Sequence, residues 1–232
     1  MSTRPSGTGL SPLRVTGALC AVLTILLGSA VLVGWAIRSP FLMQVLPGLA
    51  PMHRNTALNF ILTGIALLGI VLGKARLTLL GSAITGTLAV GSLLEYLFHA
   101  NFGFDQLFGS VFIATRTLQP TRMSSATALC FTLFAVVTIL SQSGLLVKKS
   151  TFLGITGLLV AAVGASCSIS ILAGTRDAFS LDHLNRAALH TGIGFIMLGF
   201  GLAAAALDMT QLDLREPFWV SSVPAFSSQY LE

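Results

Sequence analysis

The hydrophobic residues of this chain fall into six long runs, separated by shorter polar or mixed segments. Each run approaches or exceeds the roughly 20 residues that a helix needs to cross about 30 Å of hydrocarbon. A backbone surrounded by lipid must satisfy its own hydrogen bonds, so each run is expected to be helical. The pattern predicts an all-α polytopic membrane bundle, with transmembrane helices at Val15–Ile37, Thr56–Gly73, Leu77–Phe98, Ala126–Val147, Thr151–Gly174 and Ala187–Leu207.

The second, fourth and sixth runs begin with related sequences. The residues TALNFILTG from Thr56 recur as TALCFTLFA from Thr127 and, more loosely, as TGIGFIMLG from Thr191. Threonine can cap the first amides of a helix, and the phenylalanine four residues later lies one turn deeper on the same face. We interpret the chain as three repeated hairpins, about 15–73, 77–147 and 151–207. A packing role is expected for the shared positions Thr56, Phe60, Gly64, Thr127, Phe131, Thr191, Phe195 and Gly199.

Two further features of the second run bear on helix packing. Gly69-x-x-x-Gly73 matches a motif that lets membrane helices approach closely. Asn59 stands where the other two copies have Cys130 and Gly194. A hydrogen bond from Asn59 to a neighbouring helix is expected, contributing about 0.6 kcal/mol in a membrane.

The composition supports a membrane protein and argues against several other classes. Hydrophobic residues make up 54% of the chain and charged residues only 9%, whereas soluble domains carry about 25% charged residues. The formal net charge of +5 comes from basic residues at the ends of the runs, which does not favour nucleic acid as a partner. The sequence contains no phosphate-binding loop, nucleophile–base arrangement or metal-ligand cluster, so we expect a protein that is not an enzyme. The cysteines lie inside predicted helices and are expected to pack there without disulfides: Cys20, Cys130 and Cys167.

The basic residues also predict the orientation in the membrane. All three lysines lie in two short turns, Gly73–Arg76 and Val147–Ser150. Short loops rich in Lys and Arg favour the cytoplasmic side. We therefore expect a bacterial inner-membrane protein with both termini in the cytoplasm. Residues 1–14 are expected to be a disordered cytoplasmic segment, 15–207 the membrane domain, and 208–232 a cytoplasmic tail.

Several segments resemble a known class of membrane region. They are Met52–Leu58, Leu94–Leu97, Gly103–Phe108 and Arg122–Phe131. They are similar to the N-terminal multi-span sensor region of bacterial sensor histidine kinases and diguanylate cyclases. The resemblance implies a module that receives a signal, here without an output domain of its own.

Glu95 is the only carboxylate well inside a predicted span. An ionisable group inside a membrane helix is costly and is a functional candidate for that reason. His99 lies four residues later on the same helical face. The two form a candidate ligand-binding or proton-sensing pair; the alternative is that both lie at the interface and touch water.

Other polar residues belong to the loops opposite the lysine-rich turns. His190 could face His99 at the ends of two spans, which leaves haem or metal ligation as a minor option, although no cofactor is predicted. The arginines of these loops either extend to lipid headgroups or form a basic ring that holds an anion. Asp105 could pair with one of them: Arg54, Arg122 or Arg186.

The expected function is that of a non-enzymatic sensory membrane module that acts through another membrane or signalling protein. The alternative is an accessory or structural subunit of a larger photosynthetic, respiratory or transport complex. A small transporter or channel is less favoured, because charged residues are nearly absent from the middle of the spans. The sequence does not specify the signal, the partner or the oligomeric state.

Overall fold

All regular elements in the described part of the chain are helices, as the hydrophobic runs predict. The computed structural model describes residues 11–44, 50–98, 123–146, 148–173 and 188–215, with side chains up to residue 212. Six helices are long and apolar enough to cross a membrane, and α2 is a single short turn. The helices are α1 Pro12–Ala36, α2 Pro40–Met43, α3 Arg54–Val71, α4 Ala75–Leu97, α5 Ser125–Gln142, α6 Lys149–Leu172 and α7 Leu189–Arg215.

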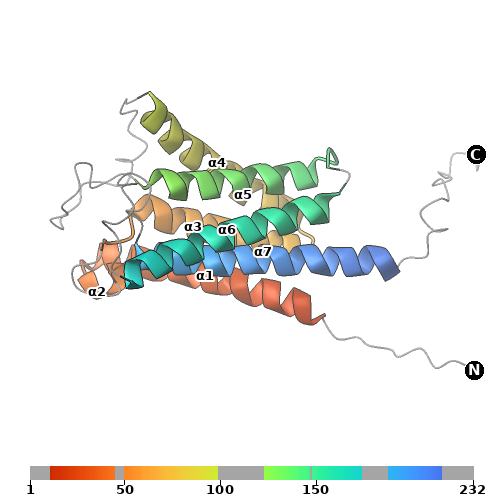
Figure 1. Ribbon diagram of the computed structural model, residues 1–232, viewed down its shortest axis with the longest axis horizontal. Coiled ribbons are helices and arrows are strands. Elements are labelled where there is room, and N and C mark those ends of the chain that lie inside the picture. The colour runs from red at the N-terminus through yellow and green to blue at the C-terminus, as the bar shows by residue number, and fades with distance from the viewer. Residues whose placement is uncertain (1–10, 45–49, 99–122, 147, 174–187, 216–232) are drawn as a thin grey trace, which may run out of the picture.

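The long helices run side by side with alternating directions (Figure 1). The starts of α1 and α2 lie at opposite ends of the bundle, and α7 ends beside the start of α1. We call the end that holds the short α3–α4 and α5–α6 connections the turn end, and the opposite end the loop end. The helices that carry the TAL-type motif, α3, α5 and α7, all begin at the loop end.

Two helix ends differ from the positions that hydrophobicity predicts. Helix α5, which corresponds to the fourth hydrophobic run, ends at Gln142 rather than at Val147. Gly144 adopts a positive φ of 74° and turns the chain there. Helix α7 continues beyond Leu207 to Arg215. The hydrophobic run stops where Asp208 introduces a charge, but a helix that leaves the hydrocarbon can continue with polar residues.

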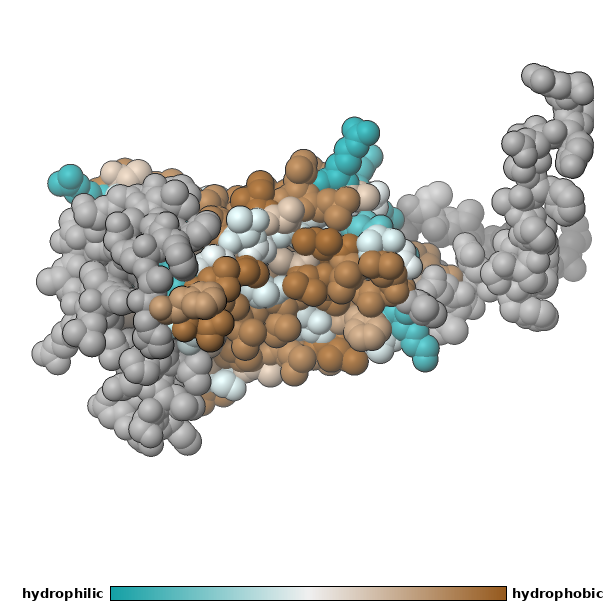
Figure 2. All heavy atoms as spheres, turned by 90° about the horizontal axis from the view of Figure 1, so that it is seen from above, coloured by the Kyte–Doolittle hydropathy of each residue, from teal (hydrophilic) through white to brown (hydrophobic). Residues whose placement is uncertain are grey.

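The motif-bearing helices lie inside the bundle, and the other three lie around them. Among the span residues, 67% are buried in α3, 61% in α7 and 50% in α5, against 33% in α1 and 39% in α4 and α6. The exposed face of the bundle is largely hydrophobic between more polar ends (Figure 2). Such a surface is suited to lipid, since water would be a poor solvent for it.

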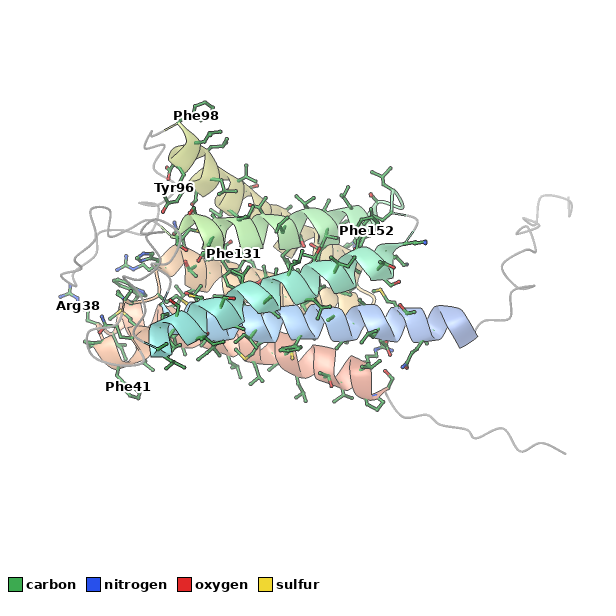
Figure 3. The ribbon with its side chains drawn as sticks, in the orientation of Figure 1. Arg38, Phe41, Tyr96, Phe98, Phe131 and Phe152 are labelled. Carbon is green, nitrogen blue, oxygen red and sulfur yellow. The ribbon has the colours of Figure 1, made fainter. Side chains whose placement is uncertain are left out.

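Three phenylalanines from α3, α5 and α7 meet in the interior. Their ring centroids lie 5.0 Å apart for Phe60 and Phe131, 5.1 Å for Phe60 and Phe195, and 4.9 Å for Phe131 and Phe195. All three are buried, and the rings are inclined by 56–72° as aromatic pairs prefer. Figure 3 shows Phe131 inside the bundle. The packing role of these positions is therefore confirmed, whereas the interpretation as three copies of one hairpin stays a prediction.

Glycine lets each outer helix approach an inner one. A Cβ added at Gly157 of α6 would lie 2.6 Å from the carbonyl oxygen of Gly199 in α7. At Gly64 of α3, a Cβ would lie 2.9 Å from the carbonyl oxygen of Ala21 in α1. These distances leave no room for a side chain, so the expected close contacts at Gly64 and Gly199 are confirmed.

The prediction for Gly69-x-x-x-Gly73 is only half right. A Cβ at Gly69 would lie 2.7 Å from the backbone nitrogen of Thr78, so Gly69 does allow α3 to approach α4. Gly73 contacts no neighbour there; it has a positive φ of 65° and forms the turn between the two helices. The second glycine is needed for the reversal of the chain rather than for the interface.

Polar contacts close the bundle at the turn end. The Nε of Arg14 donates a hydrogen bond to the carbonyl oxygen of Val71 at 2.9 Å, which joins α1 to the end of α3. The hydroxyl of Ser11 donates to the carboxylate of Asp208 in α7. The N-terminal and C-terminal spans are thus fastened to each other and to α3.

We expect Phe131→Ala to lower the free energy of unfolding by about 2 kcal/mol. Soluble cores lose about 3–5 kcal/mol on a Phe→Ala change. The loss is smaller here because a chain that unfolds within a membrane keeps its side chains in an apolar medium. Unfolding in mixed micelles with increasing denaturing detergent measures the effect. Phe200→Ala is the control, since Phe200 is 55% exposed on α7; equal losses for the two variants would contradict a central role for the phenylalanine cluster.

Candidate functional site at the loop end

Several polar side chains are buried at the loop end, where the inner helices begin. They come from the first turns of α3, α5 and α7 and from the last turns of α4. All of them are at most 7% exposed: Asn55, Thr56, Ser92, Glu95, Ser124, Thr127 and Thr191. This loop-end cluster is the best candidate for a functional site among the described residues, because a polar group that is removed from water needs specific partners.

Glu95 is fully buried in this cluster, with an exposed fraction of 0%. Glu95 therefore does not touch water, whereas the position of Glu95 and His99 relative to the membrane interface stays a prediction, because His99 lies outside the described residues. Glu95, Ser92 one turn earlier on α4, and Asn55 in the first turn of α3 each have an interaction partner. A buried carboxylate is tolerated only where such partners offset the loss of hydration. Glu95 therefore relies on its interaction partners in the protein rather than on water.

A hydrogen bond from Tyr96 joins the last turn of α4 to the segment just before α5. The hydroxyl of Tyr96 donates to the carbonyl oxygen of Met123 at 2.8 Å, directly before the N-cap of α5. The first turn of a helix carries a partial positive charge and unpaired amides. The N-terminus of α5 therefore favours a negative group on the neighbouring turn of α4. Figure 3 shows Tyr96 at this end of α4.

The motif threonines do not cap their helices, contrary to expectation. Thr56, Thr127 and Thr191 are each the third residue of their helix. In α5 the cap is Ser124, whose hydroxyl oxygen accepts from the backbone nitrogen of Thr127 at 3.2 Å and lies 2.8 Å from its hydroxyl. In α3 the N-cap residue is His53, with no side-chain capping bond. The threonines are instead buried at the same depth in each inner helix.

Arg54 packs on an aromatic ring at the edge of this cluster. Its guanidinium carbon lies 4.7 Å from the ring centroid of Trp35, a distance typical of a cation–π contact. The indole nitrogen of Trp35 donates to the carbonyl oxygen of Met52 at 2.9 Å. Arg54 is therefore held between α1 and α3. The expected ring of basic residues stays a prediction, because Arg122 and Arg186 lie outside the described residues.

The histidine pair also remains a prediction. His190 is half-buried near the start of α7, and its Nδ1 is buried without a hydrogen-bond partner. His99 and Asp105 lie outside the described residues. Within the described ranges, no group of three or more His, Cys, Asp or Glu side chains is arranged to hold a metal ion.

The prediction for Asn59 is wrong. Asn59 is fully buried on α3, yet neither its Oδ1 nor its Nδ2 has a hydrogen-bond partner in another helix or elsewhere. Thr85 of α4 is likewise fully buried, and its hydroxyl is unpaired. Sequence reasoning named none of Thr85, Ser92 and Tyr96 as a candidate site residue, although Tyr96 lies in the segment Leu94–Leu97 that carries the resemblance. Only the spacing of Ser92 from Glu95, one turn along the same helix face, offered a signal for one of them.

The cysteines behave as expected. Cys130 is buried in α5, Cys20 and Cys167 are partly buried in α1 and α6, and all three are free thiols. They lie in the spans rather than in the loop-end cluster.

Comparison of the chain with protein-family models, with curated proteins and with solved structures gave no match. The resemblance to sensor regions therefore stays a prediction, and the candidate site stands on its own geometry.

We expect Glu95→Ala to destabilise the bundle by about 1–3 kcal/mol, because it leaves buried polar partners unpaired. Glu95→Gln should cost less, since the amide keeps the shape and part of the hydrogen bonding. Detergent-induced unfolding is again the measurement. Leu94→Ala is the control on the same helix, because Leu94 is 41% exposed. A Glu95→Ala protein as stable as the unmodified one would mean that the carboxylate supports no buried partners.

Proposed function

We propose that this protein is a non-enzymatic membrane module that receives a signal at its loop end and passes it to a partner protein. The observation that carries the proposal is the burial of Glu95 among polar residues at the ends of α3, α4 and α5. An ionisable group inside a span is costly and is retained where it serves a purpose. A change in its charge or hydrogen bonding alters the packing of the helices that meet there.

Helix α7 supports a route by which such a change reaches the other end of the bundle. It begins at the loop end with His190 and Thr191, contributes Phe195 to the central cluster, and extends without interruption to Arg215. Its 27 residues correspond to about 40 Å at 1.5 Å per residue, which exceeds the thickness of the hydrocarbon. The last turns of α7 project beyond the neighbouring helices (Figure 1). A partner that binds this projecting segment would detect a shift or rotation of the whole helix.

The alternative proposal, an accessory subunit of a larger membrane complex, draws on the exposed hydrophobic faces of α1, α4 and α6. These faces carry side chains such as Leu26, Leu80 and Leu158, which are exposed by 58–63%. Lipid solvates such faces equally well. The exposed hydrophobic faces are therefore weaker support for an accessory subunit than the buried Glu95 is for a receiving module.

We further propose that the protein lies in a bacterial inner membrane with the turn end in the cytoplasm, on the basis of its lysine-rich turns. Single cysteines test this orientation. With a membrane-impermeant maleimide on intact cells, Phe98→Cys at the loop end should be labelled, whereas Leu145→Cys at the turn end should be labelled only after permeabilisation. Both residues are well exposed, at 65% and 73%. The parent protein controls for its native thiols, and the opposite labelling pattern would reverse the proposed orientation.

Site-specific photocrosslinking in native membranes tests the function itself. A benzoylphenylalanine replacing Leu212, which is 54% exposed near the end of α7, should capture a histidine kinase, a cyclase or another signalling protein. The same group replacing Leu159, which is 54% exposed on α6, is the lipid-facing control and should capture none. Glu95→Gln should then change the output of the captured partner without abolishing the crosslink. Capture of subunits of one large complex from both positions would instead establish the accessory role.

A further inference from the structure

The interface between α3 and α4 holds two buried polar side chains that have no partner. Asn59 and Thr85 are both 0% exposed. The unpaired atoms are Oδ1 and Nδ2 of Asn59 and Oγ1 of Thr85. Most buried polar groups in proteins are hydrogen-bonded, so an exception calls for an explanation.

The contact between Gly81 and Leu62 gives the register of α4 against α3. A Cβ at Gly81 of α4 would lie 2.6 Å from the carbonyl oxygen of Leu62 in α3. Thr85 follows Gly81 by one helical turn, and Asn59 precedes Leu62 by one turn. Because α3 and α4 run in opposite directions, Thr85 and Asn59 each lie one turn nearer the loop end than Gly81 and Leu62. Residues one turn apart share a helix face, so Thr85 lies on the side of α4 that faces α3, and Asn59 on the side of α3 that faces α4.

Thr85 differs from the other threonines of the spans. The hydroxyls of Thr63 and Thr138 each donate to the carbonyl oxygen four residues earlier, at 2.7 Å. Thr24 makes the same bond at 2.7 Å. This local bond is the usual way in which a hydroxyl is satisfied inside a membrane helix. The Thr85 hydroxyl does not use it and is left for another partner.

The packing of α4 is tightest toward the turn end. Gly69 contacts Thr78 there, and the hydroxyls of Ser82 and Thr138 lie 2.7 Å apart. Toward the loop end, α4 diverges from α3 and α5 (Figure 1). Asn59 and Thr85 lie where the close contact gives way to this divergence.

We propose that Asn59 and Thr85 form a binding site for a water molecule within the α3–α4 interface. An internal water typically makes about three hydrogen bonds, and the two side chains offer three unpaired atoms. An asparagine can donate and accept, as can a threonine hydroxyl and water, so one water can pair with each of these three atoms. A charged ligand fits poorly, because neither side chain carries a charge to balance it.

The sign of a stability change tests this site. With a bound water, Asn59→Leu removes two of its partners, expels it and leaves the Thr85 hydroxyl unpaired. The equilibrium constant for folding should fall about tenfold. Thr85→Val should lower it severalfold. Together the two substitutions should cost less than the sum of their separate effects, because they remove the same water.

Without a bound water the results are reversed. Asn59→Leu would then remove an unsatisfied polar group and stabilise the protein, and the effects of the two substitutions would be independent. Either result overturns the proposal. Thr24→Val is the matched control, since Thr24 is equally buried but bonds within its own helix; it should change stability little.

A second measurement uses the unmodified protein and does not depend on the variants folding. In water-edited solid-state NMR of the protein in lipid bilayers, magnetisation from water should reach the Asn59 side-chain amide rapidly. The methyl groups of the fully buried Leu67 and Leu198 should receive it slowly. An Asn59 amide that receives water magnetisation no faster than these methyls would refute the site.

Discussion

Close packing between helices is the constraint on which this structure depends. In a bilayer the hydrophobic effect does not draw helices together, because lipid solvates an apolar side chain as well as a neighbouring helix does. The helices must therefore gain from contacts that lipid chains cannot match. The three rings of Phe60, Phe131 and Phe195, with centroids about 5 Å apart, provide such a contact at the centre. The glycines of α1, α3, α4, α6 and α7 provide it between the inner and outer layers.

Much of this architecture could be predicted from the sequence, because the relevant signals are local. Length and hydrophobicity identify the six spans, since a helix must cover the thickness of the bilayer. The repeated phenylalanine identifies three residues that meet, although nothing in the sequence says that they form a triangle. Helix ends were less predictable, because they depend on backbone geometry rather than hydrophobicity. Gly144 ends α5 early, and Asp208 marks the end of a hydrophobic run without ending α7.

The candidate site could be predicted only in part, since burial depends on residues far away in the chain. Glu95 was identified from its charge, but its sequence position suggested contact with water. Its complete burial, and the hydrogen bond that joins the next residue, Tyr96, to Met123, depend on how the chain folds back on α4. For Asn59 the sequence predicted a hydrogen bond that the structure does not contain. A polar residue in a span normally finds a partner, but neither Asn59 nor Thr85 of α4 has one in the protein.

Among the described residues, the loop end of the bundle differs from the turn end in that it buries a carboxylate, that of Glu95. At the turn end, glycine and small hydroxyl residues bring α3, α4 and α5 into direct contact, and Arg14 and Ser11 fasten α1 to its neighbours. At the loop end, glycine contacts such as that of Gly28 with the carbonyl oxygen of Ala57 are equally close, but polar side chains are buried beside them, and a change in charge or hydration can rearrange their hydrogen bonds. Close-packed interiors respond to local change by switching between discrete packings rather than by yielding smoothly. Under the proposed function, a local change at Glu95 therefore switches the packing of α4 against α3, and α3, which also packs against α7, passes the change on.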